Sequence, residues 1–149
     1  MEVLALLKDK GRRVHTIASS QSVEDAICLM ADRKVSVLLV MENEQPAGIF
    51  SKEELFKFLL GKKMAAFSEI QLENAMTRNL LLAKPEDPIT TVLSKMIAAD
   101  ITYLPVIEEK KIIGILTLKD MMKHQIDALI DEIHQLKDYI ADLHEAGLD

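Results

Sequence analysis

The chain has 149 residues, of which 49% are hydrophobic, and a formal net charge of −6 at pH 7. This composition supports a compact core without a metal, and the single cysteine excludes an internal disulfide and a cysteine-based zinc site. The acidic balance argues against general nucleic-acid binding, and the longest apolar run is too short for a membrane span. The N-terminus does not resemble a secretory signal, so we expect a soluble cytoplasmic protein.

The first predicted segment, residues 1–13, is an N-terminal helix with a lead-in to the chain that follows. Residues 14–61 then show the apolar spacing of a small β-α-β-β-α unit. Ser22 is the predicted N-cap of a helix whose apolar stripe runs from Val23 to Met30. Cys28 lies inside this helix, and we expect it to pack in or near the core.

Two strands and a second helix complete this unit. The β-rich run Val35–Met41 and the short run Ala47–Phe50 predict strands on either side of a turn. Ser51 opens the second helix, which is predicted to end at Gly61. Residues 62–79 mix polar and apolar side chains and are predicted to be a connector.

The same β-α-β-β-α pattern is repeated over residues 80–125, at a constant offset of 66 positions. Gly48–Glu54 of the first copy becomes Gly114–Asp120 of the second. The helix start and the strands of this copy are predicted at Pro88, Ile101–Ile107 and Ile112–Leu116. Each unit leaves one sheet face apolar, so the two should pack sheet to sheet. The predicted fold class is α+β, with tandem β-α-β-β-α repeats related by a pseudo-two-fold axis.

Residues 126–149 predict a C-terminal amphipathic helix of coiled-coil type. Isoleucine fills every a position and leucine every d position, a combination that favours a parallel two-stranded coiled coil. These positions are Ile126, Leu129, Ile133, Leu136, Ile140 and Leu143. Glu132 at g and Lys137 at the following e would pair between the chains of a homodimer. The alternative is a helix lying on its own domain, because Ile130 widens the apolar stripe.

The repeated motif is a glycine, two apolar residues, a hydroxyl residue, two variable positions and an acid. Ser51 with Glu54, and Thr117 with Asp120, have the spacing of a capping box, in which side chains satisfy the first N–H groups of a helix. A hydroxyl and a carboxylate at a strand-to-helix corner also suit a ribose diol, and helix-start N–H groups favour an anion. Capping and binding are compatible.

Paired repeats with this motif resemble a CBS-domain pair, the Bateman module, over about Lys10 to Ile126. The resemblance extends to small stand-alone bacterial proteins of this type. It implies an adenosine-nucleotide ligand, with AMP, ADP or ATP ahead of NAD-type dinucleotides or S-adenosylmethionine, and no required cofactor or metal. It also implies two pseudo-symmetric clefts between the repeats.

The resemblance assigns residues to each cleft. The main cleft is expected to contain Thr16, Ile17, Ala18, Val35, Ser36, Val37, Thr117, Lys119 and Asp120. The weaker cleft is expected to contain Ser51, Glu54, Leu82, Ala83, Tyr103 and Pro105. The weaker cleft departs from the family pattern because Glu54 replaces an aspartate and Leu82 replaces a threonine. Further candidates for contacting phosphate are Arg12, Arg13 and Lys34.

These features predict a non-catalytic regulatory protein, a homodimer that senses an adenosine nucleotide and acts on an unknown effector protein. The alternative is a ligand-independent dimerisation or scaffold module, in which both motifs serve only as helix caps. An enzyme is disfavoured because the sequence offers no nucleophile triad, metal-ligand spacing or glycine-rich phosphate loop.

Overall fold

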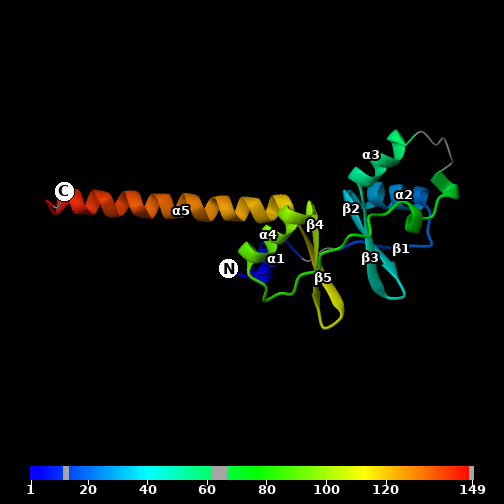
Figure 1. Ribbon diagram of the computed structural model, residues 1–149, viewed down its shortest axis with the longest axis horizontal. Helices are drawn as coiled ribbons and strands as arrows, with labels where there is room; N and C mark the ends of the chain where they lie inside the picture. Colours follow the sequence, from blue (N-terminus) through cyan, green and yellow to red (C-terminus); the bar gives the residue numbers. More distant parts are fainter. Residues whose placement is uncertain (12–13, 62–66, 148–149) are drawn as a thin grey trace.

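The computed structural model of the protein describes residues 1–11, 14–61 and 67–147. Figure 1 shows two small units of helices and strands side by side and one long helix that extends away from them. The sequence-based fold class is confirmed, since both units combine helices with a small sheet in the predicted order.

The first unit contains a three-stranded sheet with two helices. Its elements are β1 (Thr16–Ala18), α2 (Val23–Arg33), β2 (Val37–Glu42), β3 (Gln45–Ser51) and α3 (Lys52–Leu60). Strand β1 pairs in parallel with β2, and β2 pairs antiparallel with β3. Ser22 caps α2 as predicted, through a capping box with Asp25, and Ser51 caps α3. The β-α-β-β-α order is therefore present in full.

The second unit repeats this order without a complete first strand. Its elements are α4 (Ile89–Ala99), β4 (Tyr103–Glu108), β5 (Lys111–Thr117) and α5 (Leu118–Glu145). Ala83 stands where the first strand would lie and forms a single parallel bridge with Val106. Its N–H donates to Pro105 and its carbonyl accepts from Ile107, so it completes the sheet edge with one residue.

The two hairpins share the same construction. Each turns on two residues with positive φ, Asn43 and Glu44 in one hairpin and Glu109 and Lys110 in the other. This is the backbone of a two-residue turn whose twist matches the strands. A register shift follows Val40 in β2 and Val106 in β4, again 66 residues apart.

The segment before each unit packs on the other unit. Helix α1 (Val3–Lys10) buries Leu7 in the core of the second unit, beside α4 and β5. A side chain at Gly114 would meet it, because a Cβ there would lie 2.2 Å from Leu7 Cδ1. The connector, with the short helices η1 (Phe67–Glu69) and η2 (Leu72–Asn74), packs on the core of the first unit.

The two sheets meet face to face, as predicted from their apolar faces. Leu39 of β2, Ile49 of β3, Tyr103 of β4 and Ile115 of β5 form a shared buried cluster. Burial of apolar surface between the units therefore holds the pair together.

Helix α5 continues the last helix of the second unit without a break, so the predicted boundary at residue 126 falls inside one helix. Its first turns contact α1, α4 and β5, and the remainder projects away (Figure 1). Ile126, Ile133 and Leu136 are 52%, 52% and 61% exposed, so the helix does not lie on its own domain.

One prediction for the first unit is wrong. Cys28 is exposed, because α2 buries Val23 and Ala26 and the position of Cys28 falls on another face of the helix. None of the helices that the structure describes is long and apolar enough to cross a membrane.

Candidate functional site

Both repeated motifs form the predicted capping boxes. At the start of α5, the Thr117 hydroxyl accepts from the Asp120 N–H at 3.0 Å, and the Asp120 carboxylate accepts from the Thr117 N–H at 2.9 Å. At the start of α3, the Glu54 carboxylate accepts from the Ser51 N–H at 2.8 Å, and the Ser51 hydroxyl accepts from the Glu53 N–H. Each motif therefore holds its acid at a strand-to-helix corner.

The first cleft has a volume of about 240 Å³ and lies between the units, next to Thr117. Its lining residues are Lys10, Val14, His15, Lys34, Val35, Ser36, Val37, Leu39, Ile115 and Thr117. Five predicted residues are among them: Val35, Ser36, Val37, Thr117 and the phosphate candidate Lys34. The rest of the wall was not foreseen from the sequence.

Lys10 lies in the wall of this cleft and forms an ion pair with Asp120, the acid of the repeated motif. Its Nζ lies 2.5 Å from Asp120 Oδ2, and the two side chains are 35% and 29% exposed. Burial alone would raise the pKa of Asp120, but hydrogen bonds from Lys10 and Thr117 hold that pKa below its ordinary value. Asp120 is thus an ionised acceptor at neutral pH.

Several residues expected in this cleft lie outside its lining, including Asp120, which contacts the lining residue Lys10. Thr16, Ile17 and Ala18 form β1, where Ile17 is part of the core of the first unit. Lys119 is exposed and lines a separate groove at the root of α5. Arg12 and Arg13 fall outside the described residues.

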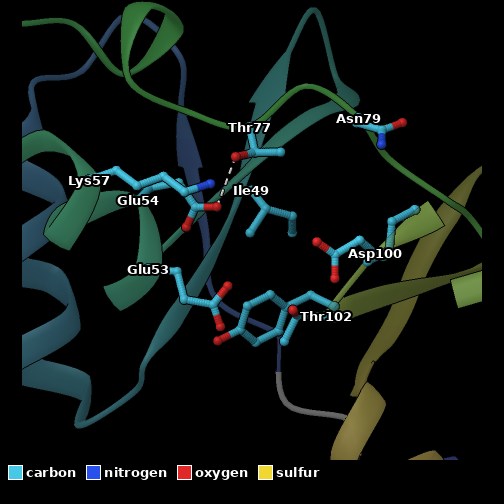
Figure 2. A pocket seen from close by; sticks show the side chains of 10 residues that line it. Ile49, Glu53, Glu54, Lys57, Thr77, Asn79, Asp100 and Thr102 are labelled. Atoms are coloured by element: carbon cyan, nitrogen blue, oxygen red, sulfur yellow. Dashed lines mark hydrogen bonds between the residues drawn. The ribbon is translucent and has the colours of Figure 1, made fainter. Parts of the chain in front are cut away.

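The second cleft lies at the equivalent place near α3 and is shown in Figure 2. It has a volume of about 90 Å³, and its lining residues are Ile49, Glu53, Glu54, Lys57, Thr77, Asn79, Asp100, Ile101, Thr102 and Tyr103. Two residues predicted for the weaker cleft, Glu54 and Tyr103, are among them.

Glu54 is held more tightly than Asp120. It is 8% exposed, and its carboxylate accepts from the N–H and the hydroxyl of Ser51 and, at 2.9 Å, from the Thr77 hydroxyl. A ligand hydroxyl would have to displace these bonds to reach it.

The remaining residues predicted for the weaker cleft lie beside it. Ser51 is buried under Glu54, and Leu82 is 41% exposed. Ala83 and Pro105 are buried in the second unit, joined by the backbone bond from the Ala83 N–H to the Pro105 carbonyl.

Tyr103 stands between the units with carboxylates around it. Burial raises the pKa of its hydroxyl, hydrogen bonds with Ser51 and Ser36 lower it, and the charges of Glu53 and Glu54 raise it, with a raised pKa as the result. The Tyr103 hydroxyl therefore stays protonated at neutral pH and can donate a hydrogen bond.

The 66-residue offset could have found part of what was missed. The predicted Lys34 and Val35 of the first cleft correspond to Asp100 and Ile101 of the second. The offset does not identify Lys10, because its contact with Asp120 depends on how α1 packs on the second unit. No cluster of three or more side chains suited to a metal occurs within residues 1–11, 14–61 and 67–147.

Several solved structures with this fold are of proteins described as containing CBS domains. A CBS-domain containing protein from Agrobacterium tumefaciens matches with a TM-score of 0.73 and 25% identity, over 84% of this chain and 99% of that one. The CBS domain pair of protein MJ0100, solved in complex with 5′-methylthioadenosine and S-adenosyl-L-methionine, matches with a TM-score of 0.71 and 22% identity, over 86% and 98% of the two chains.

Curated relatives include enzymes that are much longer than this chain. The homoserine O-acetyltransferase of Methanohalobium evestigatum is 29% identical over 74% of the chain, and the arabinose 5-phosphate isomerase of Francisella tularensis is 28% identical over 78%. The chain spans only 22% and 36% of these two relatives. The family model of the CBS domain matches residues 9–61 and 68–127. The chain therefore belongs to the CBS domain family, as a tandem pair of its repeats.

Proposed function

We propose that this protein is a non-catalytic regulator that binds an adenosine nucleotide in the cleft beside Thr117 and Asp120. The observation that carries this proposal is the composition of that cleft, which has apolar walls and two lysines, with the ionised Asp120 carboxylate next to it at the start of α5. These groups match the three parts of a nucleotide: a flat base, a ribose diol and a phosphate.

Each part of the ligand has a counterpart. The base would lie against the apolar walls formed by Val37, Leu39 and Ile115, and the ribose diol would donate to Asp120. Lys10 would release Asp120 and turn toward the phosphate together with Lys34. The side chains of the ion pair that Lys10 leaves are 35% and 29% exposed, so breaking it costs about 1 kcal/mol.

The adenosyl class is supported by the CBS pair of protein MJ0100, which was solved with 5′-methylthioadenosine and S-adenosyl-L-methionine. The choice among adenosyl ligands depends on the residues that line the cleft of this chain. Two lysines in the wall favour AMP, ADP or ATP over ligands without phosphate in this cleft.

We further propose that α5 joins two copies in a parallel coiled coil. Its seam of isoleucine at a and leucine at d is exposed, with Leu143 half-buried. The helix projects away from both units (Figure 1). Glu132 and Lys137 would pair between chains. Because α5 begins at Thr117, a ligand that shifts the cleft would act on the same helix that joins the dimer.

The test is thermal stability with AMP, ADP, ATP, NADH or S-adenosylmethionine, each at about a hundredfold over its Kd, where binding should add about 2.7 kcal/mol. Asp120→Ala should abolish the shift produced by the preferred ligand and also remove a helix cap, which costs about 1 kcal/mol. Asp131→Ala, on the exposed part of α5, controls for the loss of a carboxylate. A full ligand shift in Asp120→Ala would contradict the assignment.

The second candidate is a ligand-independent dimerisation module. It is favoured by one observation, that the hydroxyl and the acid of each motif form a complete capping box, which gives both residues a structural role. No stabilisation by any of the five ligands would support this candidate and contradict the first.

A further inference from the structure

The two clefts carry opposite charge. The lining of the cleft in Figure 2 includes three carboxylates, on Glu53, Glu54 and Asp100, against the single ammonium group of Lys57. The lining of the first cleft includes the ammonium groups of Lys10 and Lys34 and no carboxylate, with Asp120 next to it. One fold therefore presents two related sites with different electrostatic potentials.

The difference arises at equivalent positions. Lys34 ends α2 and Asp100 ends α4, both with φ of 55° and ψ of 45°, so the two side chains leave the backbone in the same geometry. Within the motif, Glu53 stands at the position that Lys119 occupies in the second repeat. The two repeats therefore share this backbone geometry and carry opposite charges at these two positions, of which only the first lines both clefts.

We propose that the cleft lined by Tyr103 binds an adenosyl ligand without phosphate, favouring one with a positively charged group, and excludes nucleotides. This proposal rests on the proposed function, since it gives the second cleft of the same module a ligand class of its own. The protein would then bind two regulatory ligands of different charge, one in each cleft.

The exclusion follows from Coulomb repulsion. A phosphate carries up to two negative charges at neutral pH and would enter beside Glu53 and Asp100, both of which are exposed at the mouth of the cleft. A sulfonium or ammonium group would be attracted by the same carboxylates. Figure 2 shows the Asp100 carboxylate pointing into the cleft, opposite Glu54 and Thr77.

The remaining lining suits an uncharged nucleoside. Ile49 and Ile101 offer apolar surface, and the aromatic ring of Tyr103 offers a stacking face. Thr77 and Asn79 can form hydrogen bonds to a base or a sugar. Nothing in this set requires a phosphate.

Two methyl groups at equivalent positions lie in the linings of the two clefts. Because both also belong to the shared buried cluster, the cleft that a ligand occupies is identified by which of the two methyl groups shifts more. Ile49 lines the acidic cleft and Ile115 lines the lysine-bearing cleft, at equivalent positions of β3 and β5. The full-length protein, labelled at its isoleucine δ-methyl groups, should be titrated by NMR with AMP, 5′-methylthioadenosine and S-adenosylmethionine. We expect Ile49 to report binding of the two ligands without phosphate at least tenfold more tightly than binding of AMP, and more tightly for the sulfonium ligand.

Charge-neutral variants test the cause. Glu53→Gln and Asp100→Asn should each strengthen AMP binding at Ile49 by about threefold, because each removes one nearby like charge. Both side chains are exposed, and asparagine accepts the left-handed backbone of position 100, so the fold should be retained. Glu109→Gln, in the β4–β5 turn outside this cleft, is the matched control and should change nothing.

The outcomes separate the two proposals. If Ile49 reports AMP as tightly as the other ligands, or reports no ligand while Ile115 reports AMP, charge sorting is wrong and the proposed function stands. If neither methyl group responds to any ligand, the proposed function fails and charge sorting fails with it.

Discussion

At the scale of single residues, the two motif acids differ in how available they are to a ligand. Asp120 is bonded by Lys10, which is 35% exposed and can turn away, whereas Glu54 is buried and bonded by Ser51 and Thr77. The extra methylene of Glu54 lets its carboxylate reach Thr77 in the connector. Glu54 therefore has a structural role in joining α3 to the connector, whereas Asp120 stays accessible to a ligand.

The ion pair of Lys10 and Asp120 makes stability depend on pH. Because the pKa of Asp120 is lowered by folding, its ionised form stabilises the fold above its unfolded pKa, and this contribution is lost as pH falls through the lower folded pKa. Lys10→Met should raise the pKa of Asp120 and cost at most about 1 kcal/mol at pH 7. Denaturant unfolding measures the free energy of unfolding of the variant and the parent at each pH. The difference between the two proteins should be smaller at about pH 2 than at pH 7.

Lys8→Met, on the same helix, controls for the loss of one positive charge. A pH-independent difference for Lys10→Met would show that its side chain acts through packing and not through Asp120.

The sequence predicted the local contacts of these residues and missed the distant ones. The hydroxyl and acid of each motif are three residues apart, so helix geometry alone brings them together. Lys10 and Asp120 are 110 residues apart, and Thr77 and Glu54 are 23 apart. Their contacts require α1 and the connector to dock on particular units, which no local pattern specifies.

At the scale of elements, the predicted strands and helices match the structure within a few residues because their signals are local. Caps at Ser22 and Ser51 and the glycine at position 61 mark the helix ends. The first strand of the second unit was reduced to Ala83. The spacing in α5 predicted a coiled-coil seam, and the structure adds that this seam projects clear of both units.

The projecting helix gives a direct test of dimer formation. Leu136→Asp places a charge at a d position, where a parallel coiled coil buries leucine, and should convert a dimer to a monomer at equal protein concentration. Leu136 is 61% exposed in the single chain, so the substitution should leave each monomer folded. Sedimentation equilibrium measures the mass directly.

Gln135→Asp, one position away and outside the seam, is the matched control. It should remain dimeric. A dimeric Leu136→Asp protein would place the subunit interface elsewhere on the molecule.

At the scale of the whole molecule, the chain is interleaved. The helix that precedes the first unit completes the core of the second, and the connector that precedes the second completes the core of the first. Leu7 and Leu72 are the buried anchors of these two segments, and both are fully buried. The core of each unit is therefore completed by the segment that directly precedes the other unit in the sequence.

This interleaving predicts opposite local effects for two matched substitutions. Leu7→Ala leaves a cavity beneath Gly114 and should destabilise the second unit, while Leu72→Ala should destabilise the first, each by about 2–5 kcal/mol. Hydrogen exchange should show amide protection falling most in α4 and β5 for the first variant and most in α2 and β3 for the second. The opposite assignment would mean that each segment stabilises the unit next to it in sequence. Because α1 also carries Lys10, Leu7→Ala should weaken the ion pair between Lys10 and Asp120, so a substitution in the core of the second unit would alter the cleft between the units.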